Sequence, residues 1–451
     1  MKGSPLPVHK TIGKLPAMWD RSGIFCVNLA SLFFGNTAEI EVLYREIGTI
    51  ESYGGRLLPV LNLIFKGSEN LLLLEREPEP SLMEYFRDVL NIGLPEVQVI
   101  PSVMYPQLLK GENREVREML GLVADHPAEW MDAFVTDSTL VRLAKLTGKR
   151  LISSPDGSKR GNNKVLLHEH LEASGLPVFD TFLAETPDKV PELTGILRNM
   201  GYRRVVIKAQ IGASGIGMVK LDVEETSECP AYLFYEGRCL VQGWLDDCIP
   251  GVRFLGSPSV QLFVHDKAVS LHDLTEQLLD GESVHQGNLS PPLYLVDDTQ
   301  TYDEILRQAQ VGGEWLHQQG YRGNASVDFH VIERNGSREV RICEINARVT
   351  GATYPTLLAG HFMPGGAWVM RNIYFSTPAR GQVILEELDR AGLLYRPGGG
   401  AGILPINFNF DRGSKIAKGQ FLAFGRTAEE VQLLLEHVGN LKALPSEYGR
   451  D

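Results

Sequence analysis

Acidic and amide side chains occur near the ends of two expected strands late in the chain. Asp328 lies in the apolar run VDFHV, and Glu344 and Asn346 lie in EINAR one strand later. Carboxylate and amide oxygens are the hard ligands that Mg²⁺ prefers, and Mg²⁺ neutralises the charge that moves in phosphoryl transfer. The pattern therefore predicts a magnesium site with Glu344 as its central ligand. The alternative interpretation is a pair of ordinary carboxylates that face solvent at strand ends.

Arg348 follows Asn346 by two residues. Alternation along a strand would place Glu344, Asn346 and Arg348 on one face. A guanidinium is planar and permanently charged, which suits a phosphoryl or carboxylate oxygen. We therefore expect Arg348 and Asn346 to act in catalysis, whereas a structural ion pair is the alternative for Arg348.

A glycine-rich segment, KAQIGASGIGM, begins at Lys208. Gly212, Ser214, Gly215 and Gly217 would let backbone amides approach phosphate oxygens without interference from a Cβ atom. We expect this segment to cover a triphosphate, although a tight turn between two strands has the same composition. Lys208 itself lies in the apolar run VVIKAQ, where a lysine without a partner is costly to bury.

Periodicity and turn residues predict the elements that carry these side chains. Asn163 and Gly175 should begin and end a helix with Lys164 in its first turn, and two antiparallel strands should flank the glycine-rich segment. The other expected elements are strands at 239–245, 259–266, 268–274, 325–333 and 339–347, a loop from His285 to Pro292 and a helix from about Asp303.

The N-terminal part of the chain has a different pattern. From Ile24 to Pro101, the runs IFCVNLAS, RLLPVLNLIF, NLLLLE and VQVIP alternate with helical stretches, which is typical of βα units. Helices are expected at 113–125 and 138–147, and a turn-rich stretch, SSPDGSKRGNN, follows. Because hydrophobic cores stop growing near roughly 250–300 residues, a chain of 451 residues should form two or three lobes. We place one boundary near Gly148.

Composition excludes some kinds of partner. The net charge is −12, so the overall field repels nucleic-acid backbones, and we expect no nucleic-acid partner. The apolar runs are far shorter than the roughly 20 residues that span a bilayer, so we expect no membrane partner. The five cysteines form no CxxC pair and follow no secretory signal, which favours a reducing, cytoplasmic setting.

The order of five motifs carries a resemblance. NNKVLLHEHLEASGLP, VVIKAQIGASGIG, LVQGWLDD, HQGN, and VDFHV with CEINAR occur in the order that characterises the ATP-grasp superfamily of carboxylate–amine ligases. Over its whole length, the chain resembles the pheganomycin-type peptide ligases of that superfamily. The resemblance implies an α/β and α+β chain, in which two α+β subdomains grip ATP behind an α/β pre-ATP-grasp domain. The implied division is 1–148 for the N-terminal domain, 149–240 for the small subdomain with the glycine-rich loop, 241–395 for the large subdomain with the metal site and 396–451 for a family-specific segment.

The resemblance also implies roles for individual residues. Lys164 and Lys208 would contact the phosphates and adenine of ATP. The hinge that holds adenine would comprise Gln242, Gly243, Trp244 and Leu245, and Asp247 would reach the ribose hydroxyls.

Further positions compare with the family less directly. His285 and Asn288 match a loop that faces the transferred phosphate in relatives, and Arg322 is a similar candidate. The chain has Gln261 and His265 where many relatives carry a basic residue after the hinge. Phosphate clamping should therefore rely more on Arg348.

The implied reaction is ATP-dependent peptide-bond formation through an acyl phosphate, with release of ADP and phosphate. ATP with Mg²⁺ or Mn²⁺ would be the cofactors. A nonproteinogenic amino-acid carboxylate would be the donor and a peptide amine the acceptor, as in antibiotic biosynthesis. A homo-oligomer is compatible with the sequence. The alternatives are a carboxylase-type ATP-grasp enzyme, a kinase that acts on a small alcohol and a non-catalytic nucleotide-binding protein.

Overall fold

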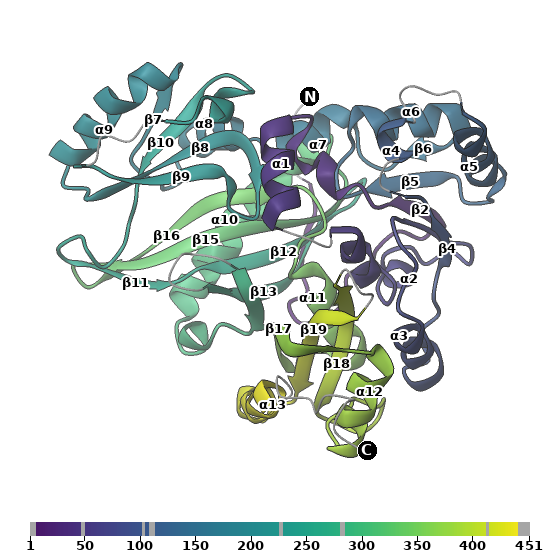
Figure 1. The fold of residues 1–451 in the computed structure, drawn as a ribbon. Helices are drawn as coiled ribbons and strands as arrows, with labels where there is room; N and C mark the ends of the chain where they lie inside the picture. The colour runs from purple at the N-terminus through teal and green to yellow at the C-terminus, as the bar shows by residue number, and fades with distance from the viewer. Residues whose placement is uncertain are drawn as a thin grey trace.

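A computed structural model describes residues 6–46, 50–101, 104–107, 113–224, 229–279, 285–411 and 415–440. Within these ranges the chain forms three β-sheets with helices packed around them (Figure 1). No described helix combines the length and the apolar character that a membrane crossing requires.

The N-terminal sheet is parallel and has the strand order β4-β3-β2-β5-β6. All four residues of β2 and of β3 are buried, as expected for a parallel sheet that is covered on both faces. This sheet confirms the predicted βα pattern. Its strands are β2 (Gly23–Cys26), β3 (Leu71–Leu74), β4 (Glu96–Val99), β5 (Trp130–Ala133) and β6 (Arg150–Leu151), and the accompanying helices are η1 (Leu29–Phe33), α1 (Thr37–Glu46), η2 (Ile50–Leu57), α2 (Leu61–Ile64), α3 (Pro80–Glu84), η3 (Tyr85–Val89), α4 (Met104–Gln107), α5 (Arg114–Asp125) and α6 (Ser138–Thr147).

One expected strand is wrong. The run RLLPVLNLIF belongs to η2 and α2, not to the sheet. Pro59 lies in the middle of this run and has no N–H for a sheet hydrogen bond, so the apolar residues are buried from helical turns instead.

The second sheet is antiparallel and has the order β7-β10-β8-β9. Asn163 caps α8 by accepting a hydrogen bond from the Leu166 amide at 3.0 Å, as predicted. The elements of this part are α7 (Pro155–Gly161), α8 (Lys164–Ala173), β7 (Thr181–Ala184), η4 (Pro187–Lys189), α9 (Val190–Asn199), β8 (Arg204–Ala213), β9 (Ile216–Asp222), η5 (Ala231–Phe234) and β10 (Cys239–Gly243).

Helix α7 corrects the expected turn-rich stretch. Ser154 caps it by accepting from the Gly157 amide at 2.9 Å, and Pro155 occupies its first turn. A Cβ atom on Gly157 would lie 2.4 Å from the Gly320 backbone. The glycines that suggested a loop therefore permit close packing of a helix.

The third sheet has ten strands, in the order β11-β15-β12-β13-β14-β17-β19-β18, with β16 beside β15 and β1 beside β13. Residues His285–Ser290 form β14, which pairs with β13 and β17, so the expected loop there is wrong. The elements are β1 (Val8–Lys10), β11 (Val252–Gly256), β12 (Pro258–Val264), β13 (Val269–Leu279), η6 (Leu293–Leu295), α10 (Thr299–Gln318), β15 (Gly323–Arg334), β16 (Ser337–Asn346), α11 (Thr353–Phe362), β17 (Ala367–Ala379), α12 (Gly381–Arg390), β18 (Gly402–Phe410), β19 (Ile416–Gly425) and α13 (Ala428–Asn440).

The C-terminal segment is part of this large sheet. Strands β18 and β19 continue it beyond β17, and η2 of the N-terminal region packs against β18. In Figure 1 the yellow-green C-terminal segment lies beside the purple α2 and α3. We retain the division at residues 148, 240 and 395 as a proposal, although β1 and β18–β19 pair across it.

Candidate active site

A cleft of about 560 Å³ lies between the four-stranded sheet and the end of the large sheet that carries β15 and β16. Strands β8 and β9 form one wall with the turn that joins them, and β15 and β16 form the other. The segment after β10 closes one end. All of the residues predicted to bind the nucleotide line this cleft, namely Lys164, Lys208, Gly212, Ser214, Gly215, Gly217, Gln242, Gly243, Trp244, Leu245 and Asp247.

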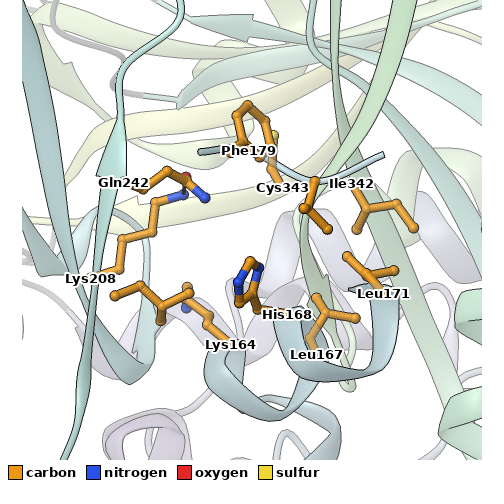
Figure 2. A pocket seen from close by; sticks show the side chains of 11 residues that line it. Lys164, Leu167, His168, Leu171, Phe179, Lys208, Gln242, Ile342 and Cys343 are labelled. Atoms are coloured by element: carbon orange, nitrogen blue, oxygen red, sulfur yellow. Dashed lines mark hydrogen bonds between the residues drawn. The ribbon is translucent and has the colours of Figure 1, made fainter. Parts of the chain in front are cut away.

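Two lysines give one side of the cleft its positive charge. Lys208 Nζ donates to Gln242 Oε1 at 2.8 Å, and Gln242 Nε2 donates to Thr181 Oγ1 at 2.9 Å. Figure 2 shows Lys208 reaching toward Gln242, beside Phe179 and Lys164. Burial lowers the pKa of Lys208. These two cations suit a polyphosphate, whose negative charge would stabilise the ammonium of Lys208.

The glycine-rich segment is a tight turn between β8 and β9. Ser214, Gly215 and Gly217 have φ angles of 55°, 82° and 84°. These angles lie in the left-handed region, which favours glycine, and glycine occupies two of the three positions. A Cβ atom on Gly212 would lie 2.5 Å from the Ile216 carbonyl oxygen. The segment therefore forms a tight turn that lines the cleft, and its closure over a triphosphate stays a prediction.

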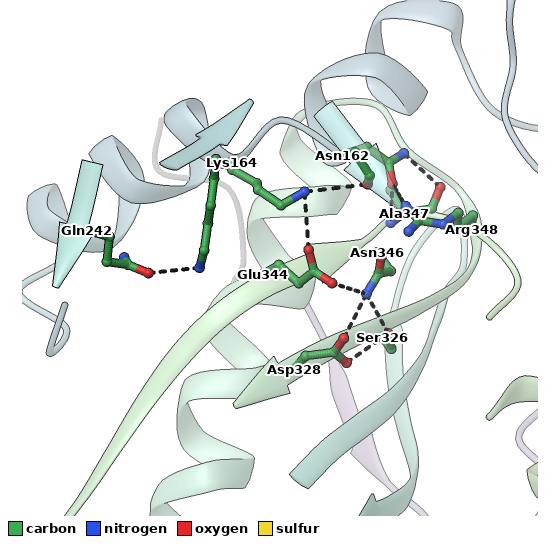
Figure 3. A network of polar contacts seen from close by, with 11 residues as sticks. Asn162, Lys164, Gln242, Ser326, Asp328, Glu344, Asn346, Ala347 and Arg348 are labelled. Carbon is green, nitrogen blue, oxygen red and sulfur yellow. Dashed lines mark hydrogen bonds and ion pairs between the residues drawn. The ribbon is translucent and has the colours of Figure 1, made fainter. Parts of the chain in front are cut away.

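Two carboxylates face each other on the opposite wall. Asp328 on β15 pairs directly with Glu344 on β16. Asn346 Nδ2 donates to Asp328 Oδ2 at 2.8 Å and to Glu344 Oε1 at 3.4 Å, and Lys164 Nζ lies 3.2 Å from Glu344 Oε2 (Figure 3). Ser259 Oγ donates to Asp328 Oδ1 at 2.6 Å.

Their environments shift the pKa values of the two carboxylates in opposite directions. Burial and then the charge of Glu344 raise the pKa of Asp328. Burial also acts to raise the pKa of Glu344, but Lys164, Arg348 and Lys208 outweigh it, so this pKa is lowered. The pair therefore favours one shared proton or a bound cation.

The donor set fits Mg²⁺. Groups of three or more His, Cys, Asp or Glu side chains that could hold a metal are absent from the described residues. Mg²⁺ sites in nucleotide enzymes, however, often use one or two carboxylates together with phosphates and waters. Asn346 presents Nδ2 to both carboxylates, so its carboxamide must turn to offer Oδ1 to a cation.

Arg348 lies just beyond this wall. Alternation along the strand was expected to include Arg348. Strand β16 ends at Asn346, so the alternation stops before Arg348. Its Nη1 donates to Asn162 Oδ1, and Asn162 Nδ2 in turn donates to the Ser158 carbonyl at 2.8 Å. Arg348 is thus held by the residues around α7, and its catalytic role stays a prediction.

The other predicted residues lie away from the cleft. His285 Nε2 and Asn288 Oδ1 are 2.8 Å apart on β14, and neither residue lines the cleft. Arg322 donates to the carbonyls of His317 and Tyr321, at 3.0 and 2.6 Å, which fits a structural role. The ring of His265 lies 4.8 Å from that of Trp19.

Gln261 connects the carboxylates to the segment before α11. Its Nε2 donates to Ser259 Oγ at 2.9 Å, and its Oε1 accepts from Thr350 Oγ1 at 3.4 Å.

The cleft also contains residues that sequence reasoning missed. His330 Nε2 lies 3.1 Å from the Leu245 carbonyl oxygen, and its ring lies 5.8 Å from Phe179 and 4.8 Å from Phe254. Burial lowers the pKa of His330 to about 4, so the ring is neutral. His330 lies two residues after Asp328, and strand alternation could have placed both at the cleft.

Comparison with known protein families and curated sequences gives limited overlap. No family model matches the chain. A [butirosin acyl-carrier protein]–L-glutamate ligase of Niallia circulans is 28% identical over 224 residues, which are 49% of this chain and 51% of that protein. A probable α-L-glutamate ligase of Shewanella loihica is 25% identical over 167 residues, 36% of this chain and 52% of that protein. The chain thus matches about half the length of each of these curated relatives.

Solved structures match nearly the whole chain. An L-amino acid ligase from Bacillus licheniformis has a TM-score of 0.55 at 12% identity, covering 93% of this chain and 98% of that one. The ADP complex of an N5-carboxyaminoimidazole ribonucleotide synthetase has a TM-score of 0.54 at 14% identity, covering 94% and 97%. Both are ATP-grasp enzymes. The chain therefore has the ATP-grasp fold and resembles the ligases of that fold, as the order of its motifs predicts.

Proposed function

We propose that this protein is an ADP-forming carboxylate–amine ligase that activates its donor as an acyl phosphate. One observation carries the proposal. Lys164 and Lys208 share a cleft with Asp328 and Glu344, and a glycine-rich turn lines the same cleft. Cations suit the phosphates of ATP, and paired carboxylates suit the metal that accompanies those phosphates.

Each group has a role in the proposed reaction. Asp328, Glu344 and the turned Asn346 carboxamide would hold Mg²⁺, which when bound neutralises charge on the phosphates. Lys164 and Lys208 hold the triphosphate, and the turn around Gly215 excludes water from the reactive intermediate. Phosphoryl transfer to a carboxylate needs positioning and charge neutralisation, so no covalent protein nucleophile is required.

Arg348 would act on the reacting groups themselves. Its guanidinium would neutralise charge on the transferred phosphoryl group and on the oxyanion that forms when the amine attacks. To do so it would exchange its contact with Asn162 for a contact with the substrate.

The proposed partners are an amino acid and a peptide. We propose an amino acid as the carboxylate donor, in line with the amino-acid ligases among the relatives. A peptide amine is the proposed acceptor, and peptide natural-product biosynthesis is the proposed setting. The Niallia relative is named for action on an acyl-carrier protein. A carrier-bound acceptor is therefore the alternative to test against a peptide acceptor. All five cysteines are free thiols, which suits a cytoplasmic enzyme.

The test is release of ADP and phosphate from ATP and Mg²⁺ with a panel of amino acids, with and without peptide amines, combined with mass spectrometry of the products. The proposal predicts ADP formation that needs both partners and a product lighter than their sum by one water. Dependence on bicarbonate would indicate a carboxylase, and a phosphorylated alcohol would indicate a kinase. ATP binding without turnover on any panel member would contradict the proposal.

A further inference from the structure

A second group of polar side chains gathers where η2 packs against the large sheet. Arg56 of η2 is 8% exposed, and its Nε has no hydrogen-bond partner among the described residues. Its guanidinium lies over the rings of Tyr53, at 4.2 Å, and Tyr354, at 5.2 Å. No ion pair joins Arg56 to a carboxylate in the described part of the chain. A bound anion would stabilise a buried arginine that has no carboxylate partner.

The sheet beneath Arg56 presents further polar side chains. Asn407 pairs with Gln420, and Asn409 pairs with Lys418, so these four side chains share one face. Asn407 Nδ2 donates to the Ser52 carbonyl of η2 at 2.9 Å, which shows that this face is the one that η2 covers.

Two carboxamides on this face are incompletely bonded. Asn409 is 3% exposed, and neither its Oδ1 nor its Nδ2 has a hydrogen-bond partner among the described residues. Gln420 is 4% exposed, and its Oε1 also has no such partner, whereas its Nε2 donates to Asn372 Oδ1 at 3.2 Å. Buried amides left without partners cost free energy, so a bound polar group would stabilise them.

Positive charge extends from Arg56 toward solvent. The pKa of His285 is lowered chiefly by burial, and the charges of Arg56 and Lys418 act in the same direction. Lys418 Nζ lies 4.8 Å from the ring of Tyr374, which is 60% exposed. The cluster therefore runs from a buried guanidinium to an ammonium beside an exposed ring.

The cluster adjoins the proposed reaction site. A Cβ atom on Gly351 would lie 3.4 Å from His285 Cε1. Thr350, the residue before Gly351, is bonded to Gln261, which connects through Ser259 to Asp328. Tyr354, which faces Arg56, follows three residues after Gly351. Residues 350–354 thus separate the metal ligands from the cluster.

We propose that Arg56, Lys418 and Asn409 bind a carboxylate group of an organic substrate. Two charged donors and the free Nδ2 donor of Asn409 match the acceptor oxygens of a carboxylate, and the tyrosine rings hold the guanidinium plane in place. This inference rests on the proposed ligase function and adds a subsite to it. The carboxylate has two possible sources, namely a second carboxylate of the donor or the C-terminal carboxylate of a peptide acceptor.

Binding assays with matched acids and amides test the subsite without turnover. Amino acids such as L-glutamate and L-glutamine represent the donor, and dipeptides with a free or an amidated C-terminus represent the acceptor. Each pair is titrated by isothermal calorimetry into protein saturated with Mg²⁺ and a non-hydrolysable ATP analogue. We expect one pair to favour the acid, and this pair identifies the source.

Variants assign the preference to the cluster. Arg56→Ala should weaken binding of the acid roughly ten- to a hundredfold, the range for loss of a charge-assisted hydrogen bond, and change binding of the amide less than threefold. Arg56→Lys should recover part of the loss. Lys418→Met is a second variant, nearer the surface, and should weaken the acid about three- to tenfold. Arg150→Ala is the matched control, since Arg150 also stacks on a ring at 4.2 Å, that of Trp130 in the N-terminal sheet.

The outcomes separate the subsite from the ligase function. An acid preference in no pair, or one that survives both Arg56→Ala and Lys418→Met, would overturn the subsite even if ADP-forming ligation is observed. An acid preference that these variants remove, in a protein that forms no ADP with any partner, would support the subsite and contradict the proposed reaction.

Discussion

Replacement of Lys208 by methionine should affect the free protein and the nucleotide complex in opposite directions. Lys208 donates its hydrogen bond to the neutral Gln242, whereas Lys164 is the lysine that pairs with Glu344. Burial lowers the pKa of Lys208, so its charge is held at a cost in the free protein. Methionine has a similar length and no charge. The variant should therefore be more stable without ligand by about 1 kcal/mol, or roughly 2 °C in Tm.

The nucleotide complex should lose more than the free protein gains. A charge-assisted hydrogen bond to phosphate contributes about 1.5–3 kcal/mol, so the affinity for ATP should fall roughly ten- to a hundredfold. Scanning fluorimetry with and without a non-hydrolysable ATP analogue and Mg²⁺ measures both effects on one sample. At a fixed, saturating ligand concentration, stabilisation by the analogue should shrink by about the same 1.5–3 kcal/mol.

A matched control is Lys189→Met, which removes an exposed lysine paired with Glu192 at 3.2 Å. It should change neither the Tm of the free protein nor the affinity for the ATP analogue. If Lys208→Met lowered the Tm of the free protein and left the affinity for the analogue unchanged, Lys208 would be a structural residue and the reasoning would be wrong.

Three further predictions concern Glu344, Arg348 and the buried Glu39. Glu344→Gln should lower Mg²⁺-dependent ADP formation roughly a thousandfold, while affinity for the nucleotide measured in EDTA stays within about threefold. Arg348→Ala should lower kcat about a hundredfold with little change in nucleotide affinity, and the reverse pattern in steady-state kinetics would move Arg348 into nucleotide binding. Burial and then Glu236 raise the pKa of Glu39 from 4.5 to about 7. The folded state holds this proton more tightly than the unfolded chain, so stability is lost as pH rises from 4.5 to 7. Glu39→Gln should thus add up to about 3 kcal/mol at pH 8 and almost nothing at pH 4, in urea unfolding; a gain independent of pH would refute this assignment.

The side chains that line the cleft could be predicted in detail because their signals are local. Alternation of apolar residues identified β8, β15 and β16, and the glycines identified the turn after β8. The order of the motifs then supplied the ATP-grasp fold. Asp328 and Glu344 were expected on adjacent strands, and antiparallel pairing of those strands is enough to bring the two side chains together.

The remaining contacts depend on pairing between distant segments. The segment His285–Ser290 is a strand because β13 and β17 flank it, and its own sequence, with Gly287 and Asn288, favours a turn. Arg348 meets Asn162 only because α7 packs beside the end of β16. Arg56 lies in an apolar run interrupted by Pro59, and only the packing of η2 on β18 reveals the polar face beneath it.

Transfer of oxygen from donor to phosphate tests the acyl-phosphate mechanism most directly. The donor carboxylate is labelled with ¹⁸O, and the inorganic phosphate released during ligation is analysed by mass spectrometry. The mechanism predicts one ¹⁸O atom in each phosphate, because the donor oxygen that attacks the γ-phosphorus leaves with the phosphate when the amine attacks. Label in AMP, with release of pyrophosphate, would show that the donor is activated by adenylation and would contradict the mechanism.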